Sequence, residues 1–395
     1  MEWQKAKRND DGSIVIPTQW LFLHYYEAFN ILFRIENVLR MIVYTVLKDE
    51  LHEKWVDCNV TDAESGQKTI GSLAKQRISQ TTTFGYLGYN VSCPVMFLNG
   101  GELIRLITSD GYWKYFKPYF LGSKEIIKNK LYEIEAIRNA MAHFRPIKED
   151  DVEVIKQNAK HVLTCISPMI EAMLSCFDVV PTNTNDPWYR ELSVVGNDLC
   201  IFRLYQSRDG IWIRIAGTFR SPVLAKRAYE KSIWYRVLTI KSAAILKHHR
   251  PLANLIIHLS EESPNKYFFV EGEQPKFKKD FSMVFSRKSL ETNYQEIKKQ
   301  LEHVIGTISK ETELIQKDHL AKGDLVCAIH TYFTEYQGKS KPYWGLDIAP
   351  LVNKVVEGDP DEYWGTSLSY YPEFVTATEN YPWMPTSVSA YDGPF

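Results

Sequence analysis

The sequence has no closely paired cysteines, no long apolar run and no strong net charge. Its six cysteines are scattered over 395 residues without a CxxC pair, which argues against a zinc site and against a secreted disulfide framework. The N-terminus, MEWQKAKRNDDG, lacks the apolar core of a signal peptide, and charges or prolines interrupt the longest apolar stretches. We therefore expect a cytoplasmic protein with no membrane span, no metal and no other cofactor.

A formal net charge of −1 gives the chain no overall attraction to nucleic acid. Residues 214–250 are an exception, because they hold nine Lys and Arg residues against one Glu, with aromatic residues between them. A basic surface with aromatics is typical of RNA binding, although a solvated helix face has the same composition. The candidate RNA-binding residues are Arg220, Lys226, Arg227, Lys231 and Arg236.

The first part of the chain, residues 1–180, reads as an all-helical bundle. Apolar residues recur at helical spacing throughout it, beginning with one long pattern over residues 17–55. Four to five such helices predict a bundle with a single core. The later helical segments are Thr69–Ser79, a short helix within Cys93–Asp110, Leu131–Pro146 and Glu149–Cys176.

The second part, residues 185–335, reads as an α+β domain after a linker of Pro, Thr, Asn and Asp at 180–187. The strongest local signal is Asp209-Gly210, which predicts a hairpin turn between two strands. The expected strands are Leu199–Gln206, Ile211–Thr218, Leu252–Leu259, Lys266–Glu271 and Phe281–Phe285, and the expected helices are Pro222–Leu246 and Leu290–Lys317.

The last part, residues 336–395, is an acidic extension rich in proline and aromatic residues. Such a composition does not readily build its own core. One hypothesis is that the extension folds back on the basic surface, or on an inhibitory partner, and restrains activity; the alternative is an inert extension. On the first hypothesis, deletion from about residue 356 raises activity or RNA affinity.

The segment Leu131–Pro146, LYEIEAIRNAMAHFRP, concentrates the residues that carry chemistry. Arg138 falls on the apolar stripe of this helix, where an unpaired charge would cost several kcal/mol, so we expect it to be paired or put to use. Asn139 and His143 share a second face, one turn apart. His143 lies in the last turn before Pro146, where the helix dipole favours the protonated form and proton transfer near neutral pH.

Glu36, in the middle of the first long helix, is the expected supporting residue. It either pairs with Arg40 along its own helix or reaches Arg138 and fixes its orientation. The non-catalytic interpretation is an internal Glu36–Arg138 ion pair together with a helix-terminal His143 bonded to a carbonyl.

The string Arg138-Asn139-Ala140-Met141-Ala142-His143 has the Arg-x4-His form of the HEPN superfamily. The order of the surrounding segments, with RIENVLR on a long first helix and EIEAIRNAMAHFRPI before a closing helix, also resembles HEPN domains of abortive-infection and related defence proteins. The resemblance covers about residues 15–178. It implies an N-terminal all-α HEPN-like bundle, followed here by the α+β domain and the acidic extension.

The resemblance also implies a metal-independent endoribonuclease, acting in phage defence or in toxin-like growth arrest. In that family the Arg and His of two chains meet in one cleft across a homodimer, so RNA and a second copy are the implied partners. Arg138 would hold the phosphate, His143 would transfer protons, and Asn139 would orient His143 or contact the phosphate.

Two other functions remain open. The first is a non-catalytic dimeric scaffold that binds RNA or a protein partner. The second is a metal-dependent nuclease in the α+β domain, suggested by Glu271-Gly272-Glu273 near Lys276, although no partner Asp stands at a convincing spacing.

Overall fold

The structure, a computed structural model, consists of two units. The helical unit comprises Met1–Tyr89, Cys93–Glu171 and Tyr371–Phe395, and the α/β unit comprises Asn90–Ser92 and Ala172–Tyr370. A helical part followed by a mixed part was expected, and this coarse fold class is confirmed. The residues that the structure describes are 7–15, 23–60, 68–84, 93–176, 179–181, 185–229, 232–262, 266–268, 276–336, 343–346, 355–356, 358–367 and 383.

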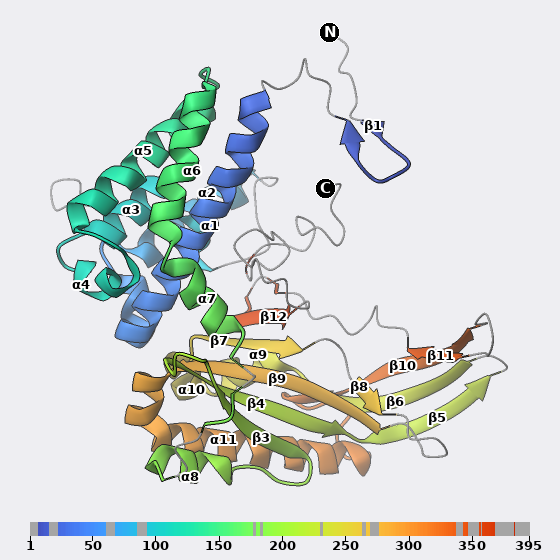
Figure 1. The fold of residues 1–395 in the computed structure, drawn as a ribbon. Coiled ribbons are helices and arrows are strands. Elements are labelled where there is room, and N and C mark those ends of the chain that lie inside the picture. Colours follow the sequence, from blue (N-terminus) through green and yellow to red (C-terminus); the bar gives the residue numbers. More distant parts are fainter. Residues whose placement is uncertain are drawn as a thin grey trace. The chain divides into compact units, whose positions relative to one another are not determined.

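The central element of the helical unit is α1 (Leu23–Leu51), which continues into a 3-10 turn at His52–Asp57. Its apolar residues are buried from Ile35 to Leu47, and it contacts α3, α4, α5 and α6. Figure 1 shows α5 and α6 packed side by side along it. The other helices are α2 (Ile70–Phe84), α3 (Gly100–Thr108), α4 (Trp113–Phe116), α5 (Lys124–Ala142) and α6 (Glu149–Leu163); a hairpin of β1 (Lys7–Arg8) and β2 (Ile14–Val15) precedes α1.

The expected single helix Glu149–Cys176 is two helices. α6 ends at Leu163, and α7 (Ile166–Leu174) follows after a break. Pro168 explains the break, because a proline lacks the N–H for the bond to the carbonyl four residues earlier, and its ring clashes with that carbonyl of Thr164.

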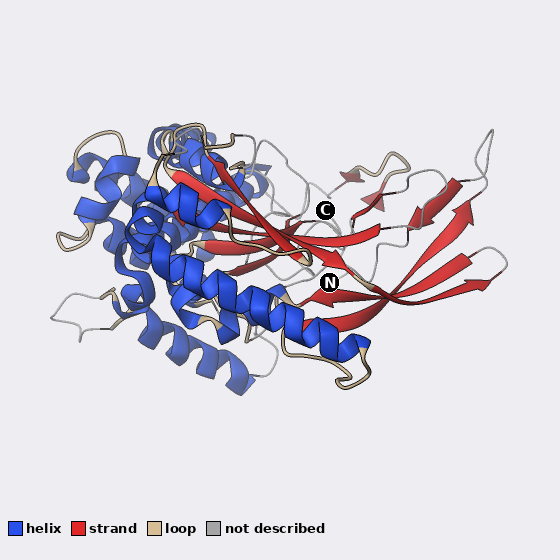
Figure 2. Ribbon diagram, turned by 90° about the horizontal axis from the view of Figure 1, so that it is seen from below, coloured by secondary structure: helices blue, strands red, loops and turns tan. Residues whose placement is uncertain are grey.

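The α/β unit contains two sheets (Figures 1 and 2). The larger has the order β12-β7-β9-β4-β3, with β8 also paired to β9; all pairs are antiparallel except β12 with β7. Its strands are β3 (Cys200–Gln206), β4 (Trp212–Ser221), β7 (His258–Glu262), β8 (Lys266–Phe268), β9 (Lys276–Ser286) and β12 (Tyr363–Ser367).

The smaller sheet has the order β11-β10-β6-β5 and is antiparallel. Its strands are β5 (Val223–Tyr229), β6 (Ser232–Ile240), β10 (Val326–Tyr336) and β11 (Tyr343–Leu346). The helices of the unit are α8 (Pro187–Ser193), α9 (Ser242–His248), α10 (Arg250–Leu255) and α11 (Arg287–Gln316).

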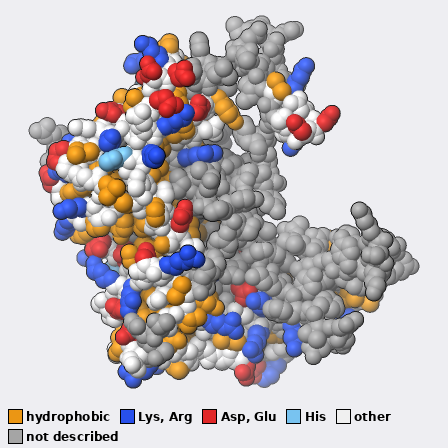
Figure 3. Space-filling view, in the orientation of Figure 1, with side chains coloured by type: hydrophobic (Ala, Val, Ile, Leu, Met, Phe, Trp, Pro, Cys, Tyr) orange, Lys and Arg blue, Asp and Glu red, His pale blue; other side chains and the backbone are white. Residues whose placement is uncertain are grey.

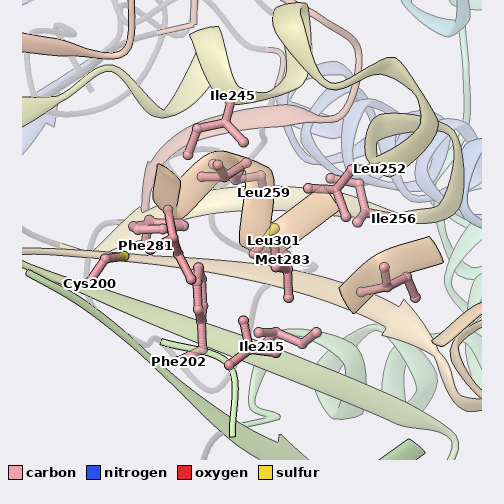
Figure 4. Close-up of a cluster of buried hydrophobic side chains, with 14 of the residues drawn as sticks. Cys200, Phe202, Ile215, Ile245, Leu252, Ile256, Leu259, Phe281, Met283 and Leu301 are labelled. Atoms are coloured by element: carbon pink, nitrogen blue, oxygen red, sulfur yellow. The ribbon is translucent and has the colours of Figure 1, made fainter. Parts of the chain in front are cut away.

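One face of the larger sheet packs on α11 and forms the main core of the α/β unit. Alternate residues along each strand point into it, as the two-residue period of a strand requires. Figure 4 shows Met283 next to Leu301 of α11, and the ring of Phe202 next to that of Phe281. Gly217 lies opposite Phe281, whose ring takes the space that a Cβ would occupy. The predicted hairpin is confirmed, with Gly210 at φ +70° in the turn.

Two expected elements of the α/β unit are wrong. Residues 222–246, expected as a helix, form β5 and β6, and only the short α9 follows them. The run SIWYRVLTI is rich in β-branched and aromatic residues, which suit a paired strand better than a helix. The expected strand Leu252–Leu259 begins instead as α10, because Pro251 starts a helical turn, and β7 follows it.

The expected boundaries at 180 and 336 also change. Two described segments of residues 336–395 belong to the sheets of the α/β unit, since β11 pairs with β10 and β12 pairs with β7. Trp383 is buried in the helical unit, where its ring meets Tyr44 edge-on with centroids 4.9 Å apart. Deletion from residue 356 would therefore remove a strand and a core residue, and it cannot test restraint by a free tail. No helix among the described residues has the length and apolar character that crossing a bilayer requires.

We predict that the buried Lys279–Glu261 ion pair between β9 and β7 is essential for the stability of the α/β unit. Both side chains are at most 4% exposed, and Tyr363 also donates to Glu261 at 3.2 Å. Lys279→Met removes the ammonium beside a buried carboxylate and should lower the free energy of unfolding by about 3–5 kcal/mol, measured by urea denaturation.

Replacing both members, in Lys279→Met/Glu261→Leu, should recover most of that loss, because no buried charge is then left. Lys298→Met is the matched control, since its partner Glu191 is 49% exposed, and its effect should be much smaller. Equal losses for Lys279→Met and Lys298→Met would contradict the prediction.

Candidate functional site

The end of α5 is fixed by a backbone motif that turns the chain sharply after His143. The N–H of Phe144 donates to the Met141 carbonyl at 2.9 Å, and that of Arg145 donates to the Ala140 carbonyl at 2.8 Å. These two bonds define a Schellman motif, in which the residue after the cap takes a left-handed conformation. Glycine is usual there, but this chain has Phe144 at φ +56°. A bulky left-handed residue is an uncommon conformation that points to a functional reason.

Arg138 faces α1, as its position on the apolar stripe predicts. Its Nε lies 3.6 Å from an Oε of Glu36, and its side chain is 34% exposed. Glu36 also pairs with Arg40, whose guanidinium donates to Asn37 at 2.7 Å and to the Leu98 carbonyl at 3.0 Å. Both expected contacts of Glu36 are thus present, and Arg40 holds the carboxylate in place against Arg138.

Asn139 links Arg138 to a second carboxylate. Its Oδ1 accepts from Nη1 of Arg138 at 3.3 Å, and its amide donates to Glu135 one turn earlier. Glu135 also accepts from the N–H of Gly101 and lies so close to Gly100 that a Cβ there would overlap the carboxylate. A polar chain therefore runs from Glu36 through Arg138 and Asn139 to Glu135; we call these four residues the Arg138 cluster.

Glu135 was missed by the sequence reasoning, although two signals pointed to it. It stands four residues before Asn139 on the same face of α5. The segment Asn99-Gly100-Gly101-Glu102 reads as a helix start, and the structure has a capping box there between Asn99 and Glu102. Glu135 thus lies at the N-terminus of α3, where backbone N–H groups and the helix dipole favour a carboxylate.

Burial raises the pKa of Glu135 above its usual 4.5. The positive charge of Arg138 opposes this rise, the charge of Glu36 adds to it, and the hydrogen bonds from Asn139 and Gly101 lower the pKa again. Glu135 is therefore a half-buried carboxyl that is harder to ionise than an exposed one.

His143 lies apart from the Arg138 cluster. It is the C-terminal cap of α5, its backbone N–H donates to the Asn139 carbonyl at 3.1 Å, and its side chain is exposed. Among the described residues its imidazole has no hydrogen-bond partner. The expected contact between the side chains of Asn139 and His143 is not formed, because the helix ends at Ala142 and Asn139 turns toward Arg138 and Glu135.

Exposed aromatic residues lie on the same unit. Tyr26, Phe29 and Phe33 recur along α1 at spacings of three and four, and the next position in that series is Glu36. Tyr26 is 46% exposed, Phe29 64% and Phe144 90%. The hydroxyl of Tyr25 bonds the Arg145 carbonyl, which brings the start of α1 against the turn after α5.

Figure 3 shows one face of the molecule. On the described part of this face, basic, acidic and apolar side chains are interspersed over the helical unit, without an extended area of one sign.

The candidate RNA-binding residues lie on strands rather than on the expected helix face. Arg220 is in β4, opposite Lys278 of β9. Lys226 and Arg227 are in β5 and Arg236 is in β6, whereas Lys231 lies outside the described residues.

The residues of the suggested metal site, Glu271 and Glu273, lie outside the described residues, and Lys276 begins β9. Within the described residues, no group of three or more His, Cys, Asp and Glu side chains could hold a metal ion.

Comparisons with known proteins provide no family for this chain. No family model, no curated protein and no solved structure matches it. A relationship to HEPN domains therefore stays a prediction from the sequence motif.

We predict that Glu135→Gln changes how stability depends on pH. The folded chain holds the Glu135 proton to higher pH than the unfolded chain, so this group's contribution to stability falls as pH rises from 4.5 through its raised pKa. The variant lacks that decline. Urea denaturation between pH 4 and 8 should show the stability of the wild type falling relative to Glu135→Gln.

Glu125→Gln, an exposed change in the first turn of the same helix, is the control for the loss of one charge. The same pH dependence in both variants would contradict a burial effect at Glu135.

Proposed function

We propose that the chain is a metal-independent endoribonuclease whose site is built around Arg138 and His143. The observation that carries the proposal is the difference between the two side chains: Arg138 contacts Glu36 and Asn139, whereas His143 is exposed. A positioned cation and an accessible imidazole are what internal cleavage of a phosphodiester requires.

The chemistry needs no group beyond these residues and the RNA itself. An imidazole accepts the proton of a ribose 2′-hydroxyl, whose oxygen attacks the adjacent phosphorus while the bond to the 5′-oxygen breaks. A protonated imidazole donates to that leaving oxygen. Arg138 places its guanidinium on the non-bridging oxygens, where negative charge develops in the transition state. The products are a 2′,3′-cyclic phosphate and a 5′-hydroxyl.

Helix geometry favours a site formed by two copies of the chain. In a regular helix, five residues at about 100° each separate the directions of Arg138 and His143 by about 140° around the axis, so the two side chains converge on one phosphate more easily from two chains than from one. Two copies would supply an Arg from one chain and a His from the other, and two His residues could divide the base and acid roles. The exposed aromatics Tyr26, Phe29 and Phe144 suit a face covered by a second copy.

A role in phage defence or toxin-like growth arrest belongs to the same proposal and rests on the resemblance to HEPN defence proteins. The second candidate function is a non-catalytic dimeric scaffold that binds RNA or a protein partner. It is favoured by the ion pair of Arg138 with Glu36, which also satisfies the guanidinium structurally. Cleavage assays on motif variants separate the two.

We predict that purified protein cleaves RNA in the presence of EDTA and leaves 2′,3′-cyclic phosphate ends. His143→Ala should lower the rate by about 100-fold or more, since it removes the proton carrier. Arg138→Ala should lower it by roughly 100-fold, and Arg138→Lys should recover only part of this because lysine cannot hold a phosphate bidentately. Initial rates and end-group analysis measure these effects.

His161→Ala and Arg105→Ala are the matched controls, because both residues lie on helices of the same unit. Arg105 is exposed, and His161 is half-buried with a ring nitrogen 3.0 Å from the Leu121 carbonyl. They should cleave at the wild-type rate. Cleavage that needs a divalent metal, or that survives His143→Ala and Arg138→Ala together, would refute the proposal. RNA binding without cleavage would favour the second candidate function, a non-catalytic scaffold.

We predict that Phe144→Gly separates fold stability from self-association. Glycine accepts the left-handed conformation at this cap, so the free energy of unfolding should rise by about 1 kcal/mol. Loss of the exposed ring should weaken the dimer and lower the specific activity, most strongly at low protein concentration. Light scattering and denaturation measure the two effects.

Ile126→Ala is the control, because Ile126 is 48% exposed near the other end of α5 and should affect neither dimer nor rate. A monomeric wild type with full activity would argue against a two-chain site.

A further inference from the structure

One face of the smaller sheet in the α/β unit carries a row of aromatic and basic side chains. Arg227 of β5 pairs with Trp234 of β6, which pairs with Tyr332 of β10, so the three stand in line across three strands. In the neighbouring row of the same face, Arg236 of β6 stands opposite His330 of β10. The register therefore brings together residues as far apart in the sequence as Arg227 and Tyr332.

The two rings in this row form a stacked pair. The centroids of Trp234 and Tyr332 are 4.9 Å apart and their planes differ by 24°. Trp234 is nevertheless 41% exposed, so the pair presents aromatic surface to solvent. Arg227, Arg236 and His330 are exposed as well.

The opposite face of the same strands contains a small buried core. Tyr235 and Val237 of β6 form a small core with Phe277 of β9. On the face of Trp234, the main core includes Leu238 of β6 and Val326 of β10, which lie at one end of the strands. Figures 1 and 2 both show these strands extending past the end of α11. The outer half of this face therefore lies beyond the helix.

The charge on this outer half has one sign. Its residues with described side chains are Ala225, Arg227, Ser232, Trp234, Arg236, His330 and Tyr332, none of which is acidic. Within the described part of the chain, neither Arg227 nor Arg236 has a carboxylate partner. Arg138, in contrast, is paired with Glu36.

We propose that this face, defined by Arg227, Trp234, Arg236, His330 and Tyr332, is a binding platform for single-stranded RNA. A base stacks on the exposed surface of Trp234, and the flanking arginines contact the phosphates. Aromatic rings on a sheet accept any unpaired base, whereas bases in a duplex are stacked on one another and do not offer their faces. This half of the face carries two arginines and no described acidic side chain, so its charge suits a polyanionic strand. The choice of RNA over DNA rests on the proposed nuclease function. The proposal of a platform for a single strand rests on the sheet face alone.

The register also decides which basic residues belong to the platform. Arg227 and Arg236 are on the face of Trp234. Lys226 is on the other face, with its ammonium 5.8 Å from the centroid of Tyr235, and Arg220 lies in the larger sheet. Only two of the described basic candidates are therefore expected to contribute directly to this binding.

Binding of fluorescently labelled 12-nucleotide RNA to the full chain carrying His143→Ala tests the proposal, because this background removes the proposed cleavage. Trp234→Leu should weaken binding by about 10- to 100-fold, and Trp234→Phe should retain most of it, since leucine keeps apolar area but lacks a flat ring. Arg227→Ala and Arg236→Ala should each reduce the slope of log affinity against log salt by about 0.7. Arg190→Ala on α8 should leave the slope unchanged.

The same sequence as duplex RNA should bind at least tenfold more weakly than the single strand. Equal binding by Trp234→Leu and the parent, or preference for the duplex, would overturn the platform. Tighter binding of single-stranded DNA would overturn the assignment to RNA. Cleavage by the His143-containing protein is scored separately, so a failed platform and a failed nuclease give different results.

Discussion

The ion pair between Glu36 and Arg138 is the contact on which the candidate site depends. It joins the two longest helices of the helical unit and places a guanidinium at their junction, 34% exposed. A charge in that position requires compensation, which Glu36 supplies from one side and the Asn139–Glu135 pair supplies from the other. The guanidinium therefore contacts groups on both helices and is still partly open to solvent. In the proposed reaction, such positioning would suit a group that meets charge developing in a transition state.

The end of α5 differs from Arg138, because its backbone is fixed while its side chains are exposed. Its backbone is closely specified by the Schellman bonds and by the contact of Tyr25 with the Arg145 carbonyl. The imidazole of His143 nevertheless extends from this rigid turn into solvent, and Phe144 takes a conformation that glycine would adopt more easily. A chain optimised only for stability would have a glycine there. We therefore relate the exposed Phe144 to the proposed contact with a second copy.

The sequence was most informative where the signal is local, and least where the outcome depends on distant partners. The amphipathic period identified α1, α5 and α11, and Asp209-Gly210 identified a turn, because both reflect backbone geometry over a few residues. The strands of residues 223–240 were misread as a helix because their pairing with β10, nearly 100 positions away, decides their conformation. Glu135 was missed for the same reason: its role follows from Gly100 and Gly101 on another helix.

The basic residues have two different kinds of surroundings, which a count of charges does not distinguish. Arg138 and Arg40 are offset by Glu36, and Glu135 lies beside them, so this site has little net charge with which to attract a polyanion. Arg227 and Arg236 lie on a face whose described side chains include no acid. Catalysis depends on interactions that strengthen in the transition state, whereas ground-state affinity depends on unpaired charge and stacking. The proposed nuclease would have a nearly neutral reaction centre, so its affinity for RNA would have to come from elsewhere in the chain. The proposed platform at Trp234 would supply it.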